Sequence, residues 1–391
     1  DITFDNCMIT GDLHFGGDSL SLSIIESTIE AQNEDQFGLL MFGDGNNIEV
    51  NQASVRGFEK GLILVSGDDV QLQGTGLILE ESSGDGITSN TFGGVINLNE
   101  LSISDVRNGL NVFEPSAILV EGVSISNCLR HCIIASDGSV LTLKYGQLVN
   151  AQVGIRLGAY GQLNLYNSCV KNQGNIGLIT QSPSNINHCD IVFNGEEGLV
   201  TSNNNFHTLN NSILWGNNPS NFTQIDIGGG VISTSHSTVQ GQSGYGVTGS
   251  GQFYWGEGVI EADPLFADDD LHLNTYSPCV DGGQPWLMDA HMPFGLGGVR
   301  ADMGMYGGPD NGYWGGLALP DGASNLQAVE DSPQDQGNTV GLTFSSSFYD
   351  NSDLVNNVTH YAFWRHFDPT GESIATVAEG NWELLGEMTS L

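Results

Sequence analysis

The sequence predicts an all-β protein: a right-handed parallel β-helix of about ten coils with three strands per coil, a C-terminal cap and a partial β-sandwich module. Three observations lead to this prediction. Short apolar runs recur at a nearly constant spacing, glycine makes up 54 of 391 residues, and cap-like segments follow the last repeat. A short strand cannot bury its inner face alone. Stacking coils at about 4.8 Å pairs every strand and creates a continuous core.

The repeat consists of three apolar columns, and three columns per period predict three strands per coil. The first is an apolar pair that returns eight times, and the other two recur with the same period, which is about 23 residues. The pairs begin at Gly38, Gly61, Gly86, Gly109, Cys132, Gly154, Gly177 and Gly198. The second column is Ile103, Ile125, Leu148, Val170, Ile191 and Ile213, and the third is Leu98, Val120, Leu143, Leu165, Asn187 and Leu209.

A polar column accompanies the apolar ones and is predicted to mark one turn of each coil. Asparagine tolerates the left-handed backbone that such turns need, and stacked amides hydrogen-bond to each other and to the backbone. The column consists of Asp105, Asn127, Asn150, Asn172, Asn194 and Asn217.

A leucine-rich repeat has a similar period and is the rival fold. It requires a sustained pattern of leucines followed by asparagine at fixed spacing. Here the asparagine follows its isoleucine by two positions at Ile125 and Asn127, but by four at Ile213 and Asn217. The irregular spacing favours the β-helix.

Charge and cysteine content limit the partners and the compartment. Nine Lys and Arg residues face 46 Asp and Glu residues, which gives a formal net charge of -37. This charge argues against nucleic acid, polyanionic substrates and anionic membranes. No apolar run approaches the ~20 residues of a membrane-spanning helix. We expect a secreted or cell-surface protein. The six cysteines are too sparse for a disulfide scaffold, and Cys169 and Cys189 are one position out of register, so no bridge between them is expected.

The repeat ends near residue 257, and four short segments follow it in order. They are Asp263–Phe266 (DPLF), His272–Leu273, Ser277–Gly283 (SPCVDGG) and Ala301–Gly308 (ADMGMYGG). This succession resembles the C-terminal end of bacterial secreted right-handed β-helix repeat proteins of the pectin-lyase-like fold family. The resemblance covers roughly residues 1–316 and implies architecture, not activity.

We expect residues 258–316 to cap the last open coil, because a solenoid needs a terminal cap. The apolar contacts of this cap are expected from Leu265, Phe266, Leu273, Met303 and Tyr306. The β-helix itself is assigned to residues 1–257. The chain begins inside a strand-like run, so we expect it to be a segment of a longer protein.

Residues 317–391 contain four β-type runs. They start at Asn325, Thr339, His360 and Trp382, and their order resembles the first half of a fibronectin type III sandwich. Such a sandwich has about seven strands, so the module is expected to be partial.

Few residues have the pattern of a catalytic site. The pectin-lyase-like family contains polysaccharide lyases and glycoside hydrolases, but the polygalacturonase-type motifs and the pectate-lyase signature are missing here. Arg107 and Arg130 each precede a repeated pair by two positions, so they should stack on adjacent coils beside His131. These three are the candidate catalytic residues, with an arginine acting as base on a sugar acid. The alternative is a solvated coil corner.

Consecutive carboxylates at Asp268, Asp269 and Asp270 are the candidate metal ligands, because Ca²⁺ prefers oxygen donors. They lack the spaced acidic loop of a calcium-binding motif, so a solvated loop is the alternative. No other cofactor is expected.

Three functions remain open at this stage. The first is a non-catalytic extracellular structural or adhesive rod that binds a neutral glycan or another surface protein. The alternative is a carbohydrate-active enzyme, either a polysaccharide lyase or a glycoside hydrolase. The third is self-assembly of rods, because open coil ends present unpaired strand edges.

Overall fold

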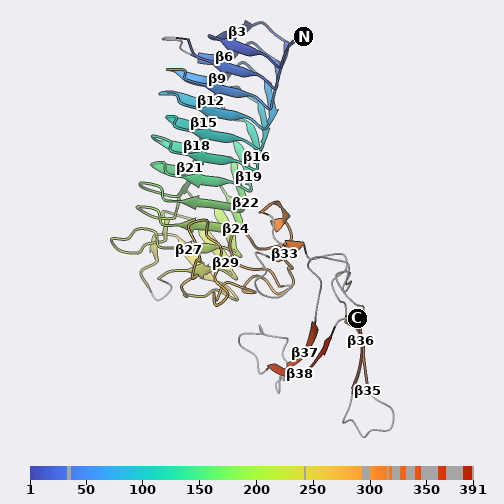
Figure 1. Ribbon diagram of the computed structural model, residues 1–391. Coiled ribbons are helices and arrows are strands. Elements are labelled where there is room, and N and C mark those ends of the chain that lie inside the picture. The colour runs from blue at the N-terminus through green and yellow to red at the C-terminus, as the bar shows by residue number, and fades with distance from the viewer. Residues whose placement is uncertain are drawn as a thin grey trace. The chain divides into compact units, whose positions relative to one another are not determined.

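The repeat folds into a right-handed parallel β-helix, as predicted, with 11 coils instead of about ten (Figure 1). In this computed structural model, residues 1–32, 37–241, 244–292 and 300–314 are described, together with the strands in 317–318, 326–331, 340–344, 360–366 and 382–389. Each coil contributes three strands in succession. The first and second strands of all coils join in one sheet of 21 strands, and the third strands form a sheet of 11.

Stacking of equivalent strands builds these two sheets. The first strands are β1 (Ile2–Asp5), β4 (Ser21–Ile25), β7 (Asn47–Asn51), β10 (Gln71–Thr75), β13 (Val95–Asn99), β16 (Ala117–Glu121), β19 (Val140–Lys144), β22 (Gln162–Lys171), β24 (Ser184–Val192), β26 (Phe206–Asn210), β29 (Val231–Ser235) and β32 (Gln252–Trp255). The second strands are β2 (Met8–Thr10), β5 (Thr28–Glu30), β8 (Ser54–Arg56), β11 (Ile78–Glu80), β14 (Ser102–Ser104), β17 (Ser124–Ser126), β20 (Gln147–Val149), β27 (Ile213–Trp215) and β30 (Thr238–Val239). β22 and β24 each run through first and second position. The third strands are β3 (Leu13–Gly16), β6 (Phe37–Phe42), β9 (Gly61–Ser66), β12 (Asp85–Asn90), β15 (Asn108–Val112), β18 (His131–Ala135), β21 (Val153–Leu157), β23 (Leu178–Thr180), β25 (Leu199–Thr201), β28 (Ile225–Ile227) and β31 (Val247–Gly249).

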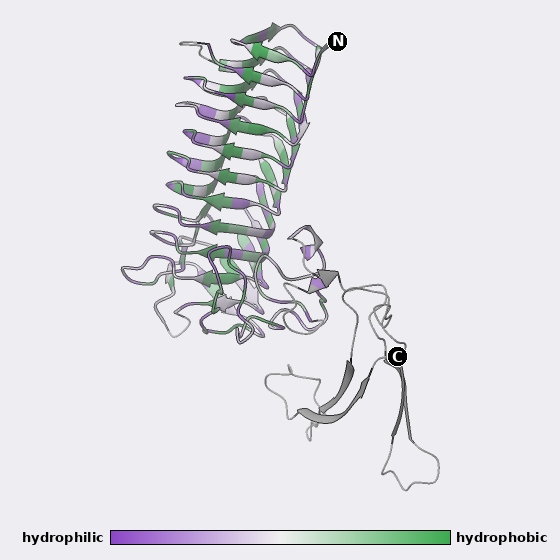
Figure 2. Cartoon of the chain, in the orientation of Figure 1, coloured by the Kyte–Doolittle hydropathy of each residue, from purple (hydrophilic) through white to green (hydrophobic). Residues whose placement is uncertain are grey.

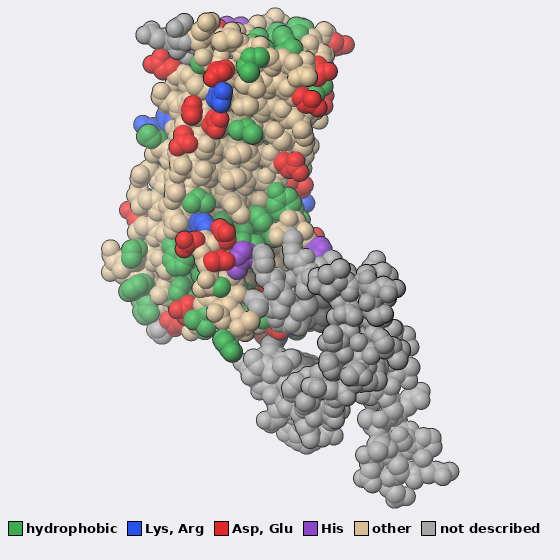
Figure 3. Space-filling model, viewed as in Figure 1, with side chains coloured by type: hydrophobic (Ala, Val, Ile, Leu, Met, Phe, Trp, Pro, Cys, Tyr) green, Lys and Arg blue, Asp and Glu red, His purple; other side chains and the backbone are tan. Residues whose placement is uncertain are grey.

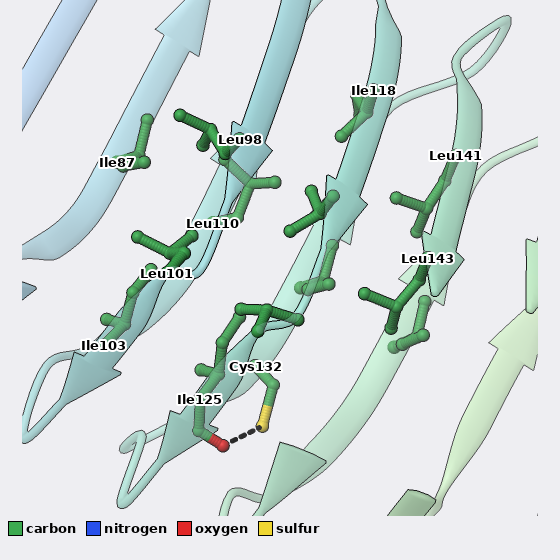
Figure 4. Close-up of a cluster of buried hydrophobic side chains, with 14 of the residues drawn as sticks. Ile87, Leu98, Leu101, Ile103, Leu110, Ile118, Ile125, Cys132, Leu141 and Leu143 are labelled. Atoms are coloured by element: carbon green, nitrogen blue, oxygen red, sulfur yellow. Dashed lines mark hydrogen bonds between the residues drawn. The ribbon is translucent and has the colours of Figure 1, made fainter. Parts of the chain in front are cut away.

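The core fills the interior of the coils. Inward side chains of all three strands form one continuous cluster of Leu, Ile and Val, most of them fully buried. Figure 2 shows the apolar strands and the more polar turns. Figure 4 shows core residues from successive coils. Among them, the Cys132 thiol donates a hydrogen bond to the carbonyl of Ile125, with the two atoms 3.8 Å apart. Such burial contributes about 25 cal/mol per Å² of apolar surface, so the stacked core stabilises the rod.

The predicted columns are confirmed in the middle of the rod, where Ile103, Ile125 and Leu148 pair in register. Three assignments in the apolar columns are wrong by one position. Leu62, not Gly61, aligns with Gly38 and Gly86, because the coils on either side of β9 are one position longer than the predicted period. Ile186 takes the place assigned to Asn187, and Leu214 takes the place assigned to Ile213.

The polar column divides into two parts. Asp105, Asn127, Asn150 and Asn172 adopt the expected left-handed backbone, with φ between 54° and 57°. Asn194 and Asn217 do not. They are buried and form an amide ladder, in which Asn194 Nδ2 donates to Asn217 Oδ1 at 2.8 Å. The left-handed corner continues on the later coils at Phe193 (φ 57°) and Gly216 (φ 70°), so Asn194 and Asn217 lie one position after the column that was predicted for them.

Residues 258–289 and 300–314, here called the flank segment, pack along the side of the rod. The segment includes a short 3-10 helix, η2 (Asn311–Trp314). Its apolar residues cover outward side chains of β22, β24 and β27 in a second cluster. The members are Cys169, Val192, Ile213, Leu271, Leu273, Cys279, Met303, Met305 and Tyr306, with Phe266 and Trp314 packed against them. Of the five apolar contacts expected for the cap, Leu265 is exposed. The assignment of residues 258–316 as a cap of the last coil stays a prediction.

Polar contacts fix the flank segment to the turns of the rod. Asn167 Nδ2 donates to the carbonyls of Met305 and Gly307, at 3.1 and 2.7 Å. The buried carboxylate of Asp190 accepts from the Met305 amide at 3.3 Å. Glycine is required at Gly308, where φ is 89° and a Cβ would lie 2.5 Å from His188 Nε2.

The remaining described strands form small antiparallel pairs. β33 (His291–Met292) pairs with β34 (Leu317–Ala318), β35 (Leu326–Asp331) with β36 (Val340–Phe344), and β37 (His360–His366) with β38 (Trp382–Thr389). The last four strands lie where the sequence predicts them. Residues 1–289 and 296–314 form one compact unit, and residues 290–295 and 315–391 a second. Membership of a fibronectin-like sandwich stays a prediction.

All six cysteines are free. Cys189 lies in the core of the coils and Cys169 lies under the flank segment, on the opposite side of the sheet. The prediction that these two thiols do not form a bridge is confirmed, and so is its reason, because Cys189 aligns with Ser168.

Candidate functional site

The arginines singled out by the repeat do stack on adjacent coils. The Arg130 amide donates to the carbonyl of Arg107 at 2.9 Å, and the Gln152 amide donates to that of Arg130 at 2.9 Å. His131 begins β18 and pairs with Asn108 at the start of β15. The turn before the third strands therefore brings both arginines and the histidine to the side of the 11-stranded sheet at which its strands begin.

A buried carboxylate organises this edge. Asp85, at the start of β12, is 1% exposed. It accepts from Arg107 Nε at 2.8 Å and Nη2 at 3.0 Å, from Asn108 Nδ2 at 2.8 Å and from Asn111 Nδ2 at 2.7 Å. Burial favours the protonated acid, but the hydrogen bonds from these three residues outweigh it and hold the pKa of Asp85 below its ordinary value.

Arg107 and His131, the basic residues nearest to Asp85 in this cluster, differ in protonation. The hydrogen bond to Asp85 raises the pKa of Arg107, so its guanidinium stays charged. His131 Nδ1 lies 3.1 Å from Asn108 Oδ1. Burial lowers the pKa of His131, and the charges of Arg156 and Arg130 lower it further. The imidazole is therefore neutral at pH 7 and lies in a positive field.

Sequence reasoning missed Arg156. It lies in β21 in register with Ile134, and its outward side chain is exposed. Unlike Arg107, neither Arg130 nor Arg156 forms an ion pair with a carboxylate of the described residues. Arg156 lines a shallow cavity of about 250 Å³ together with Asn111, Phe113, Ile134, Asp137 and Gln181. The available signal was its position directly after a repeated pair, on the coil after Arg130.

This cluster, which we call the arginine edge (Asp85, Arg107, Arg130, His131, Arg156), is suited to binding rather than to proton transfer. Asp85 is ionised and fully engaged, and Arg107 is held in an ion pair. Two guanidiniums remain available to an anionic group. Acidic side chains outnumber basic ones on the face shown in Figure 3, as they do in the whole chain, so a local cationic edge is unusual in this protein.

The three consecutive aspartates lie in the flank segment. The Asp268 carboxylate accepts from its own loop: from the Asp270 amide at 3.1 Å, the His272 amide at 3.1 Å and His272 Nδ1 at 2.7 Å. The carbonyl of Asp269 accepts from Lys171 Nζ. In the described part of the chain, no group of three His, Cys, Asp or Glu side chains is arranged to hold a metal ion. The geometry gives Asp268 a turn-stabilising role, and Ca²⁺ binding here stays a prediction.

Comparisons with protein-family models, with curated proteins and with solved structures returned no match for this chain. Among the described residues, no helix has the length and apolar character needed to cross a membrane.

Proposed function

We propose that the chain is a non-catalytic extracellular or cell-surface rod that binds glycan or protein partners along its flat strand faces. The support comes from the arginine edge, where Asp85 and Arg107 are both held in hydrogen bonds. Asp85 and Arg107 satisfy each other and the neighbouring amides, so the carboxylate closest to the arginines is not free to act as acid or base. A glycoside hydrolase needs two carboxylates placed about 5 to 10 Å apart across the bond, one of them able to hold a proton.

Binding without turnover is the measurement that tests this function. The full chain is applied to a glycan array and to a panel of soluble polysaccharides, and the soluble fraction is assayed for new reducing ends and unsaturated sugars. The proposal expects retention on at least one glycan or one cell surface with no new product. Release of product from any polysaccharide of the panel would overturn it.

The second candidate is a carbohydrate-active enzyme, most simply a polysaccharide lyase. The pair Arg130 and Arg156 favours it. The positive charges of both arginines lower the pKa of His131, and neither arginine has a carboxylate partner among the described residues. An arginine near the α-proton of a sugar acid would have to act as the base, and a guanidinium ordinarily stays protonated. Lyase activity that is lost in Arg130→Ala and kept in Arg56→Ala would establish this candidate.

Self-assembly is the third role to test. Sheet edges can pair with further strands when they are left open. Size-exclusion chromatography with light scattering separates the two outcomes, because a monomer has a mass of 41.6 kDa and an assembling rod elutes as multiples of it.

A further inference from the structure

A second cavity lies on a different face of the rod, where the flank segment begins to cover the second strands. Its volume is about 340 Å³. We call it the tyrosine cleft. The polar and aromatic residues among those that line it are Glu100, Ser102, Ser124, Gln147, Tyr145, Tyr313 and Trp314. It is built on the second strands, whereas the arginine edge is built at the start of the third strands, and the two share no residue.

The aromatic wall of the tyrosine cleft is held in place by its own contacts. Tyr145 and Tyr313 stack with ring centroids 4.5 Å apart and planes 10° from parallel. Trp314 meets Tyr313 edge-on at 5.1 Å, and its indole Nε1 donates to the carbonyl of Asn167 at 3.1 Å. Tyr313 is nevertheless 48% exposed. A large aromatic side chain is therefore fixed in position and open to solvent.

The floor of the cleft is polar and regular. Ser102, Ser124 and Gln147 are consecutive outward residues of β14, β17 and β20, and they pair in register. Strand stacking repeats them at about 4.8 Å. They supply two hydroxyls and one amide, each of which can both donate and accept a hydrogen bond.

The rim of the cleft is acidic, which decides the charge of the ligand. Burial raises the pKa of Tyr313, and the negative charge of Glu100 raises it further. Burial also raises the pKa of Tyr145, and the negative charge of Asp310 adds to that shift. The nearby cation, Lys144, is paired with Glu121 at 3.0 Å. An anionic sugar would be repelled here, in contrast to the arginine edge.

We propose that the tyrosine cleft binds a neutral pyranose ring, stacked on Tyr313 and hydrogen-bonded by the serine and glutamine floor. A fixed aromatic face beside a few polar groups is the usual composition of a small-molecule site. This inference rests on the proposed function as a binding rod and names one site and one ligand class for it.

Calorimetric titration of the full chain with neutral oligosaccharides tests the proposal. The probes are cellohexaose, xylohexaose, laminarihexaose, maltohexaose and chitohexaose, with trigalacturonate as the anionic counterpart. At least one neutral probe should bind, and trigalacturonate should not compete for it. Tyr313→Ala should weaken binding about tenfold or more, as expected when a stacking platform is lost. Tyr313→Phe should retain it, because the ring carries the contact.

Gln147→Ala is the independent variant, and it should weaken the same probe several-fold with the melting temperature unchanged. Tyr276→Ala is the matched control, since this tyrosine is 87% exposed and lies outside the cleft. If a neutral probe binds equally well to Tyr313→Ala, Gln147→Ala and the wild type, the site is wrong and the binding function stands. If no neutral probe binds the wild type while the glycan array retains it, the cleft proposal fails alone. If no neutral probe, no glycan of the array and no cell surface binds the wild type, both proposals fail.

Discussion

One row of outward residues on the second strands behaves in opposite ways in its two halves. On β14, β17 and β20 the row is Ser102, Ser124 and Gln147, and it faces solvent or the tyrosine cleft. On the next coils the same row continues as Cys169, Asp190 and Ile213, all buried under the flank segment. The strands of both halves stack in the same register. The difference in burial between the halves therefore comes from the flank segment, which covers only one of them.

One face of a solenoid is therefore not a uniform surface. The change from serine to cysteine and isoleucine marks where the flank segment begins. The larger residues pack against Met303, Met305 and Tyr306, which come from a distant part of the chain. The uncovered positions Ser102, Ser124 and Gln147 carry polar side chains.

The largest expected effect comes from a charge placed in the covered half. Ile213→Asp buries a carboxylate among apolar groups and should destabilise the flank segment by about 3–5 kcal/mol. Urea unfolding of the full chain, followed by tryptophan fluorescence, measures it. Ser124→Asp is the control in the same row and should change stability by less than about 0.5 kcal/mol. Equal losses in the two variants would contradict the comparison.

A cavity on the covering side should have the next largest effect. Met303 is 2% exposed and packs in the flank cluster, so Met303→Ala should cost about 2–4 kcal/mol. Met8→Ala removes the same side chain at a position that is 69% exposed and should cost almost nothing. A thermal melt of each variant decides whether the flank segment is packed as tightly as the rod; similar melting temperatures would show that it is not.

The two stacked arginines should differ in how much each contributes to the free energy of unfolding. Arg107→Ala removes two of the hydrogen bonds to buried Asp85 and should cost about 1–3 kcal/mol, because a buried ionised group loses its partner. Arg130→Ala should change stability by less than about 0.5 kcal/mol, since this side chain is outside any ion pair among the described residues. The idea that Asp85 organises the edge would be refuted by an Arg107→Ala variant as stable as the wild type.

A pH dependence confined to the covered half is also expected. Burial raises the pKa of Asp190 to about 8 and that of Asp302 to about 8, with the charge of Lys171 partly opposing the first shift. The folded state therefore holds these protons more tightly than the unfolded state, and docking of the flank segment weakens as pH rises toward 8. Burial lowers the pKa of His188 to about 4, which costs stability only below its ordinary pKa of 6.5. The aspartates and the histidine oppose each other below pH 6.5, so the effect of the aspartates is clearest between pH 6.5 and about 8.

Hydrogen exchange across this window measures the effect. After correction for intrinsic rates, protection of the flank segment should fall between pH 6.5 and about 8, while that of the middle coils stays constant. Asp190→Asn keeps the shape without the titrating group and should reduce the slope. An unchanged slope in this variant would assign the dependence to other groups.

Sequence periodicity was sufficient for the fold but not for every register. The middle coils could be aligned because each column has one apolar candidate. At Ile213 and Leu214 two adjacent apolar residues compete, and only the flank segment explains why both are apolar: Leu214 fills the core and Ile213 faces outward. At Gly61 the similarity of two Gly-Leu pairs favoured the wrong frame, because the coils there are one position longer.

The candidate site was predictable only in part. Arg107 and Arg130 were found because equal spacing in a repeat means stacking in space. The sequence did not predict Arg156 or the burial of Asp85. Both depend on which side of its strand, β21 or β12, the side chain occupies. The tyrosine cleft joins Tyr145 to Tyr313, which are far apart in the chain, and no local pattern reports such a contact.

Thiol labelling of a single row shows whether the flank segment covers one half of that row and leaves the other half open. In a Cys7→Ser background the five remaining cysteines are buried, and Cys169 is 2% exposed with its pKa raised to about 12 by burial. Adding Ser124→Cys places a thiol in the same row, two coils earlier, on the uncovered half. We expect native protein with Ser124→Cys to react with one equivalent of maleimide at the new thiol, while Cys169 stays unlabelled until the flank segment unfolds. Labelling of Cys169 at the rate of the new thiol would contradict it.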